Sequence, residues 1–485
     1  MPPGAVAPPC QYPMTRTRRY FFCGVGGSGM LPLAMIMHAR GHVVEGSDRS
    51  LDQGRTARKF DFLRAQGILL YPQDGSGISH ADQILVTSTA VEATVPDVVS
   101  ARRIGARQTT RAELLAEIFN AASHSIAVGG TSGKSTTTGM IGWILDQAGR
   151  TPTILNGAIM NNFNTADTPF ASAVWGDADL FVSEVDESDG SIARFRPRIA
   201  VLNNIAVDHK SLDELRALFR DFVDTGEIAI LNLDNDETAA IAGERAADKK
   251  VTYSLKDPQA DLRAGDLVAA PGGVAFHVSE RASGATWPVN LPVPGRHNVE
   301  NALAALAAAR ASGVALEQAC AMLGSFKGIQ RRLEIAGVAN GVTVIDDFAH
   351  NPDKISATLA TLHEFPGRLL VMFQPHGFGP LSLMKDAFIE CFAAGMEDAD
   401  ILLMPEPVYF GGTVERKVTS QDIVRGVGAR GRRAHGLADR NACGEKLLEL
   451  VRSGDRIVVM GARDDTLSEF AADLLRDLGE LSLEP

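Results

Sequence analysis

The segment at residues 125–145 constrains the fold of this chain more than any other. An apolar run leads into the glycine-rich turn Gly-Gly-Thr-Ser-Gly-Lys-Ser at 129–135, and a helical pattern continues to residue 145. Glycines let consecutive backbone N–H groups point at phosphate oxygens, and the positive end of the following helix adds to the attraction. Lys134 can then neutralise the β- and γ-phosphates, and the Ser135 hydroxyl can hold Mg²⁺. The segment therefore predicts a strand, a phosphate-binding loop and a helix in a protein that uses ATP.

One departure from the usual loop leaves a second interpretation open. A further glycine normally stands five residues before the last one, and here that position is Val128. The match is therefore to the compact form Gly-Thr-x-Gly-Lys-Ser/Thr. A glycine-rich turn that carries a surface lysine is the alternative.

Composition narrows the class of protein. A chain of 485 residues suggests roughly three domains. The formal net charge of −12 argues against nucleic acid as a partner, because no basic surplus can displace counterions. The five cysteines form no Cys-x-x-Cys pair, which favours reduced thiols and a cytoplasmic location. No apolar stretch approaches the roughly 18 residues of a membrane span, and the proline-rich residues 1–17 predict a disordered extension.

The N-terminal segment has the pattern of a dinucleotide-binding fold. Strand-like runs at 20–23, 42–45 and 83–87 alternate with a helical pattern, and a glycine turn follows the first run. We expect a diphosphate at the helix end after Gly29, with Asp48 accepting from a ribose hydroxyl. A glycine turn that leads into any other α/β domain would look similar.

Two polar clusters follow strand-like runs in the central segment. Glu184 opens an acidic stretch after residues 180–183, and His209 ends a polar stretch after residues 199–202. Ligands bind at the carboxyl ends of parallel strands, where a carboxylate and an imidazole could hold a second divalent ion. Solvated loops are the alternative, and the acidic residues 186–189 beyond Glu184 are interpreted as solvated. Residues 250–288 read as an insertion of short β-stretches.

The last segment predicts another parallel, doubly wound sheet. Its strand-like runs are 342–345, 369–373, 401–404 and 456–460, and its helical patterns are 352–362, 381–392, 442–451 and 467–478. Polar residues again follow the first two strands, at 346–352 and 374–376.

Seven motifs follow one another along the chain. They are the glycine turn at 24–30, the phosphate-binding loop at 130–136, the acidic stretch at 184–189, the polar stretch at 204–209, Gly-Arg-His-Asn-Val-Glu-Asn at 295–301, Arg-Arg-Leu-Glu at 331–334 and Asp-Phe-Ala-His-Asn-Pro at 347–352. In this order they resemble the Mur ligases, the ATP-dependent amino-acid ligases of peptidoglycan assembly. The resemblance covers nearly the whole chain from about residue 18 onward.

The resemblance implies an α/β fold of three domains. A Rossmann-like UDP-binding domain would occupy residues 18–121, a central P-loop ATPase-like domain 122–328, and a Rossmann-like domain for the incoming amino acid 329–485. The UDP substrate would be bound by Gly24, Gly26, Gly27, Ser28, Gly29, Asp48 and Ser88. ATP would be bound by Gly130, Thr131, Ser132, Gly133, Lys134, Ser135, Thr136, Asn298, Asn301 and Asp347. Mg²⁺ would be held by Ser135, Glu184 and His209, catalysis would rest on Lys134, Glu184, His209 and Arg332, and His350 and His376 would face the amino acid.

The implied reaction joins the carboxyl of UDP-N-acetylmuramate to the amine of L-alanine through an acyl-phosphate, with ATP and Mg²⁺. Other motifs resemble the family members that attach a recycled muramyl tripeptide, so an amino acid and a short peptide both remain as partners. The chain also departs from the alanine-adding members. They carry Arg-Tyr-Thr-Arg where Gly377-Phe-Gly-Pro380 stands here, and Asn351 and Ser132 each replace a histidine.

Two other classes of function remain. An NAD-dependent oxidoreductase would rest on the first glycine turn alone, and it leaves the ATP loop unexplained. A degenerate paralogue that binds UDP-sugar and ATP without catalysis would account for the altered loop at 377–380. We expect a cytoplasmic enzyme that is a monomer or a weak homodimer, with no nucleic acid partner and no membrane insertion.

Overall fold

The computed structural model describes residues 17–89, 91–206, 210–407, 417–462, 464 and 466–481. The chain forms two compact units. The first comprises Met1–Ile159, Phe163–Val251 and Ala311–Gly313, and the second Met160–Asn162, Thr252–Arg310 and Val314–Pro485. The predicted metal ligand His209 and nearly all of the predicted disordered extension lie outside the described residues.

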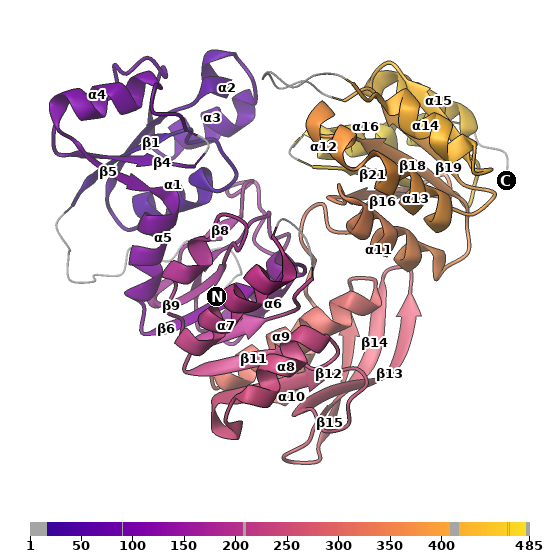
Figure 1. The fold of residues 1–485 in the computed structure, drawn as a ribbon, viewed down its shortest axis with the longest axis horizontal. Coiled ribbons are helices and arrows are strands. Elements are labelled where there is room, and N and C mark those ends of the chain that lie inside the picture. Colours follow the sequence, from indigo (N-terminus) through magenta and orange to yellow (C-terminus); the bar gives the residue numbers. More distant parts are fainter. Residues whose placement is uncertain are drawn as a thin grey trace. The chain divides into compact units, whose positions relative to one another are not determined.

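The first unit begins with a five-stranded parallel sheet in the order β3-β2-β1-β4-β5 (Figure 1). Its strands are β1 (Arg19–Cys23), β2 (Val43–Ser47), β3 (Leu69–Tyr71), β4 (Gln83–Thr87) and β5 (Arg107–Thr110), and its helices are α1 (Met30–Ala39), α2 (Arg49–Asp52), α3 (Ala57–Ala65), α4 (Pro96–Ile104) and α5 (Arg111–Asn120). Successive side chains of β1 point to opposite faces, so Phe22 packs with Leu33 of α1 while Phe21 packs with Val98 of α4. Helices therefore cover both faces of this sheet.

The second sheet of this unit has the order β11-β10-β6-β9-β7-β8. Its strands are β6 (His124–Gly129), β7 (Pro152–Leu155), β8 (Ala173–Val174), β9 (Asp177–Glu184), β10 (Ile199–Leu202) and β11 (Ile228–Asn232), and its helices are α6 (Lys134–Gln147), α7 (Leu212–Thr225), α8 (Asp236–Glu244) and the short η1 (Ser191–Arg194) and η2 (Ala247–Lys249). All of its pairs are parallel except β7 with β8. The register aligns Val128 with Glu184 and Leu202 with Gly129, so β6, β9 and β10 end at one edge.

The second unit begins with β-hairpins. The strands β12 (Lys250–Ser254), β13 (Leu262–Ala270), β14 (Gly273–Glu280) and β15 (Thr286–Leu291) lie side by side, and β13, β14 and β15 pair antiparallel. The helices α9 (Arg296–Ala311) and α10 (Leu316–Leu323) follow. The short β-stretches expected at residues 250–288 are thus the strands of regular β-hairpins. The strands are longer than the short apolar stretches in the sequence indicate.

A six-stranded sheet completes the second unit, in the order β16-β17-β21-β18-β19-β20 (orange to yellow in Figure 1). Its strands are β16 (Glu334–Ala339), β17 (Val342–Asp347), β18 (Leu369–Gln374), β19 (Ile401–Pro405), β20 (Arg433–Leu437) and β21 (Arg456–Gly461), and its helices are α11 (Pro352–His363), α12 (Phe378–Leu383), α13 (Lys385–Gly395), α14 (Ser420–Gly428), α15 (Arg440–Leu450) and α16 (Thr466–Glu480). Val371 packs in the core with α11, α13 and α14, whereas its neighbour Met372 packs with α15 and α16.

The sheets confirm the predicted α/β class, and two expectations for the last segment need correction. β16 pairs antiparallel with β17, so the sheet is not wholly parallel. The helix expected at 381–392 is two helices, α12 and α13, that meet at Met384, whose ψ of 20° lies outside the helical range.

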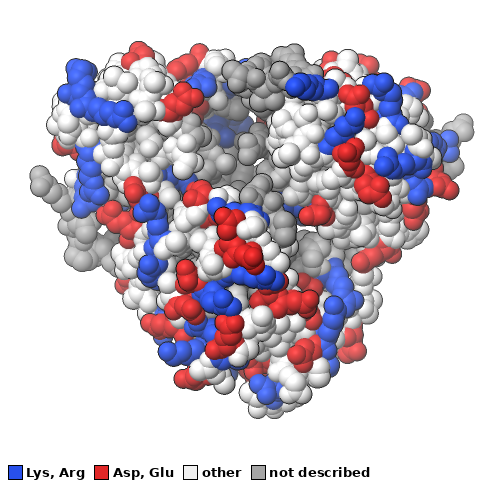
Figure 2. All heavy atoms as spheres, in the orientation of Figure 1, with Lys and Arg blue, Asp and Glu red and all other residues white. Residues whose placement is uncertain are grey.

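Two surface properties bear on partners. No helix among the described residues is long and apolar enough to cross a membrane. Figure 2 shows basic and acidic side chains interspersed over the visible face of the molecule.

Candidate functional site

The predicted phosphate-binding loop joins β6 to α6. Gly130 and Gly133 have φ angles of 127° and 82°, which L side chains rarely adopt. A Cβ on Gly130 would also lie 3.1 Å from the Asn204 carbonyl oxygen. Both glycines are thus required by the backbone path, and α6 begins directly at Lys134.

The segment after β10 braces this loop. The Asn204 side-chain oxygen accepts from the Ser132 N–H at 2.9 Å, and the Asn204 carbonyl accepts from the Thr131 N–H at 3.1 Å. Asn203 donates to the Thr137 hydroxyl of α6 at 2.9 Å. The two asparagines brace the curved loop through these hydrogen bonds.

The acidic stretch after β9 contacts the two functional side chains of the loop. The Ser135 hydroxyl donates to the Glu184 carboxylate at 2.7 Å. The Lys134 ammonium donates to both carboxylate oxygens of Glu187, at 2.8 and 3.1 Å, and to the Gly130 carbonyl at 2.7 Å. Glu187 is only 6% exposed, so its interpretation as a solvated residue is wrong.

Hard oxygen donors gather where a metal ion is predicted. The Ser135 hydroxyl and the Glu184 carboxylate are the type of ligand that Mg²⁺ prefers, so these residues fit the ion. The Oδ1 atom of Asn156, whose amide donates to the Ser135 carbonyl at 2.9 Å, is buried and accepts no hydrogen bond among the described residues. No group of three histidine, cysteine or acidic residues in the described part of the chain forms a metal cluster by itself.

The first glycine turn lies between β1 and α1. Gly24 has a φ of 84°, and the Gly26 N–H donates to the Asp48 carboxylate at 2.9 Å. The other oxygen of Asp48 accepts from the Ser50 N–H at 2.8 Å and caps α2. Asp48 therefore supports the turn, and its predicted contact with a ribose stays a prediction.

Arg111, which no sequence pattern singled out, lies against this turn. A Cβ on Gly29 would lie 3.0 Å from Cδ and 3.3 Å from Nε of the Arg111 side chain. The Arg111 guanidinium also forms an ion pair with Asp189 at 3.4 Å. It thus connects the glycine turn with the acidic stretch after β9.

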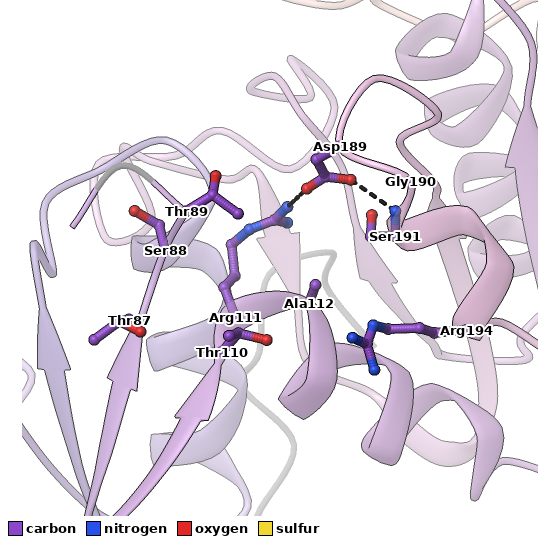
Figure 3. A pocket seen from close by; sticks show the side chains of 10 residues that line it. All are labelled: Thr87, Ser88, Thr89, Thr110, Arg111, Ala112, Asp189, Gly190, Ser191 and Arg194. Carbon is purple, nitrogen blue, oxygen red and sulfur yellow. Dashed lines mark hydrogen bonds and ion pairs between the residues drawn. The ribbon is translucent and has the colours of Figure 1, made fainter. Parts of the chain in front are cut away.

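A cavity of about 180 Å³ opens beside this arginine (Figure 3). Its walls include the hydroxyl-bearing Ser88, Thr89, Thr110 and Ser191. Arg194, which pairs with Glu113 at 3.5 Å, also lines the cavity. The predicted substrate residue Ser88 therefore lies at a polar cavity that Arg111 also lines.

In the second unit, neighbouring arginines at 331 and 332 have different surroundings. Arg331 is buried and bonds to Asp346 at 3.2 Å, although burial raises the pKa of that carboxyl. Arg332 is half-buried and lies over the Phe348 ring, with its guanidinium carbon 4.8 Å from the ring centroid. Asp347 accepts from the Leu333 N–H at 3.1 Å and the Thr358 hydroxyl at 2.5 Å.

The two histidines predicted on the amino-acid side lie together. Their rings meet edge to face, with centroids 5.5 Å apart. Burial, followed by the nearby cation of Lys354, lowers the pKa of His350 to about 3. Because His350 Nδ1 lies 2.8 Å from the Phe348 carbonyl, the neutral ring carries its proton there and leaves Nε2 as an acceptor.

The predicted adenine-binding asparagines both lie on α9. Asn298 donates to the Pro294 carbonyl at 2.7 Å, and Asn301 donates to the Asn298 side-chain oxygen at 3.0 Å. Both are buried, so they form one rigid polar pair.

A braced phosphate-binding loop beside acidic residues, in an α/β chain with a second glycine turn, defines a nucleotide-binding enzyme. Three families match the chain in order: the Mur ligase family catalytic domain at residues 19–123, the Mur ligase middle domain at 128–309, and the Mur ligase glutamate ligase domain at 331–463. The chain therefore belongs to the Mur ligase family, and the predicted ATP-dependent ligation in peptidoglycan precursor synthesis is confirmed.

Three individual proteins illustrate the likeness. The UDP-N-acetylmuramate–L-alanine ligase of Agrobacterium fabrum is 34% identical over 476 residues, which cover 95% of this chain and 97% of that protein. The solved structure of a UDP-N-acetylmuramate–alanine ligase from Thermotoga maritima matches with a TM-score of 0.76 at 23% identity, over 95% of this chain and 99% of that one. A murein peptide ligase from Psychrobacter arcticus matches with a TM-score of 0.68 at 28% identity, over 96% and 100%.

Proposed function

We propose that this enzyme joins the carboxyl of UDP-N-acetylmuramate to the amine of L-alanine, with ATP and Mg²⁺. The arrangement of Lys134, Ser135 and Glu184 at the end of β6 and β9 carries the proposal, because it offers a cation to a polyphosphate and hard oxygen donors to the Mg²⁺ that would accompany it. The Agrobacterium fabrum relative is similar over nearly the full length of both chains, and its name, UDP-N-acetylmuramate–L-alanine ligase, supports the choice of substrates.

The chemistry follows from the weakness of a carboxylate as an acyl donor. The substrate carboxylate oxygen bonds to the γ-phosphorus, the bond to the β-phosphate oxygen breaks, and ADP leaves. The amine then attacks the acyl carbon of the resulting acyl-phosphate, loses a proton, and inorganic phosphate leaves. Lys134 offsets charge on the transferring group, and Mg²⁺ held by Ser135, Glu184 and His209 would supply further charge compensation.

The remaining residues are proposed to position the reactants. The diphosphate of the UDP substrate would bind the turn of Gly24, Gly26, Gly27, Ser28 and Gly29, with Asp48 and Ser88 beside it. Asn298 and Asn301 would read the adenine of ATP, Arg332 and Asp347 would contact ATP, and His350 and His376 would face the amino acid. We also propose a cytoplasmic location and three domains: the UDP-binding domain at residues 18–121, the central domain at 122–328 and the amino-acid domain at 329–485.

A second candidate is the attachment of a muramyl tripeptide. The murein peptide ligase of Psychrobacter arcticus is 28% identical over nearly the whole chain. Gly377 and Pro380 also stand where alanine-adding members of the family carry arginines. A wider amine site without these side chains would suit a longer acceptor.

Phosphate release separates the two candidates. The full-length protein is incubated with UDP-N-acetylmuramate, ATP and Mg²⁺, and each amine is added in turn. Release that depends on L-alanine and on the UDP substrate supports the proposal. Release with muramyl tripeptide alone supports the second candidate, and no release with any amine would leave only the non-catalytic paralogue.

A further inference from the structure

Three carboxylates from one short segment hold three separate groups of the first unit. Within residues 184–189, Glu184 accepts from the Ser135 hydroxyl, Glu187 binds the Lys134 ammonium, and Asp189 pairs with Arg111. Lys134 and Arg111 are cations beside the two glycine-rich turns, which are the places where phosphates are proposed to bind. The carboxylates therefore take the partners that phosphates would otherwise engage.

Arg111 contacts both the first turn and the acidic segment at 184–189, whose other carboxylates bind the second turn. Its side chain lies against Gly29 of the first turn. Its guanidinium reaches Asp189 from the start of α5 (Figure 3). The contact with Asp189 is 3.4 Å long and single, whereas Asp189 also accepts from the Ser191 N–H at 2.9 Å. A diphosphate offers a guanidinium paired, charge-assisted hydrogen bonds that this contact lacks.

We propose that Arg111 is a positioning residue that couples nucleoside diphosphate binding at the first glycine turn to ATP binding at the second, through Asp189. This inference rests on the proposed function. A diphosphate on Gly29 draws Arg111 from Asp189, and the segment that carries Glu187 loses one of its anchors. Lys134 is then more easily transferred from Glu187 to the phosphates of ATP.

The coupling must be reciprocal, because each ligand changes the affinity of the other by the same factor. It should appear without turnover, so binding of unreactive ligands measures it. UDP is the probe for the first turn, and a non-hydrolysable ATP analogue with Mg²⁺ is the probe for the second. We expect saturating UDP to tighten binding of the analogue by roughly five- to a hundredfold, the usual range of coupling between sites.

Three variants locate the coupling. Arg111→Ala should weaken UDP binding about ten- to a hundredfold, as expected for loss of a charged hydrogen bond, and should abolish the effect of UDP on the analogue. Asp189→Asn should keep UDP binding and still lose the effect. Arg107→Ala is the matched control, because it removes an exposed guanidinium that pairs with Glu117 at 3.9 Å, four residues before Arg111. It should behave as the wild type.

Calorimetric titration gives distinct outcomes. Coupling that survives in both Arg111→Ala and Asp189→Asn would overturn the inference, and so would UDP binding without coupling in the wild-type protein. The latter result would leave the proposed function intact. A wild-type protein that does not bind UDP would overturn the proposed function together with the inference. If Arg111→Ala fails to fold, Asp189→Asn alone decides the question.

Discussion

The ammonium of Lys134 lies 2.8 Å from one carboxylate oxygen of Glu187 and 3.1 Å from the other. The lysine side chain is 19% exposed and that of Glu187 only 7%, so water screens the pair poorly. Lys134 also donates to the Gly130 carbonyl at the start of the loop. It is therefore held in place across the phosphate-binding loop by the protein's own acceptors.

Lys134→Ala should abolish ligation and leave binding of the UDP substrate nearly intact. The lost cation faces the transferring phosphoryl group, where loss of one stabilising contact typically costs about 10²–10³-fold in rate. The glycine turn that is proposed to bind UDP is formed by other residues, which lie between β1 and α1. Phosphate release measures the first effect, and calorimetric titration with UDP-N-acetylmuramate measures the second. A comparable collapse of UDP-substrate affinity would show that the two sites were assigned wrongly.

Gly157→Ala should damage the metal site and spare the fold. A Cβ at residue 157 would lie 1.9 Å from a carboxylate oxygen of Glu184, and the Glu184 side chain end can move aside. The displaced carboxylate would lose the Ser135 hydroxyl and its proposed Mg²⁺. We expect an activity loss of about 10²-fold that excess Mg²⁺ partly restores, with a melting temperature within a few degrees of the wild type. Gly243→Ala, where a Cβ would meet nothing within 4 Å, is the control.

Replacement of Arg331 should lower mainly the stability of the protein, whereas replacement of Arg332 should lower mainly its activity. Arg331→Ala leaves the buried Asp346 without its cation, a change that typically costs about 3–5 kcal/mol. Arg332→Ala removes a half-buried guanidinium whose stacking over Phe348 is worth about 0.5–1 kcal/mol, and this arginine is proposed to contact ATP. Urea denaturation and phosphate release on both variants check the contrast. Equal loss of stability in the two would refute it.

The sequence predicted the inner strands of the sheets because they are apolar runs buried on both faces, such as Leu369–Gln374. It also located the phosphate-binding loop, where the glycines are dictated by the backbone. It did not predict the edge strands β3, β5, β16 and β20, which are partly exposed. It could not identify Arg111, because an arginine at a helix start has no distinctive pattern and its partners are 78 and 82 residues away in the chain. Glu187 was misjudged for the same reason, since burial of a charged side chain depends on a cation from another element.

His350 should lower the free energy of unfolding at acidic pH. Its pKa is about 3 in the folded chain and near 6.5 when unfolded, so below pH 6.5 the unfolded state binds the additional proton. Stability from this group is full above about pH 7 and is lost as the pH falls toward 3, by up to about 1.4 kcal/mol per pH unit. His350→Gln should therefore lose less stability than the wild type between pH 7.5 and 4.5 in urea denaturation. Parallel pH profiles for both proteins would contradict this assignment.

The amine specificity should depart from tight selection of L-alanine, because Gly377 and Pro380 stand in place of two arginines. An arginine holds a carboxylate bidentately, and losing such a bond costs on the order of 1.5–3 kcal/mol, or roughly ten- to a hundredfold in affinity. If arginines at these two positions hold the carboxylate of L-alanine, the Michaelis constant for L-alanine should be poor here, and glycine, L-serine or muramyl tripeptide should be preferred in a competition assay.

Restoring one arginine tests the cause of this preference. Gly377 has a φ of 147°, which an arginine would adopt only with strain, whereas Pro380 lies in the first turn of α12, where other residues are tolerated. Pro380→Arg should therefore lower the Michaelis constant for L-alanine about tenfold or more if the missing arginines hold its carboxylate. Pro380→Gln controls for loss of the proline ring and should not. If the arginines only assist closure of the domains, L-alanine remains the best amine and Pro380→Arg raises turnover instead. A sub-millimolar constant for L-alanine in the wild-type protein, with no preference for any rival, would restore the plain alanine-ligase assignment.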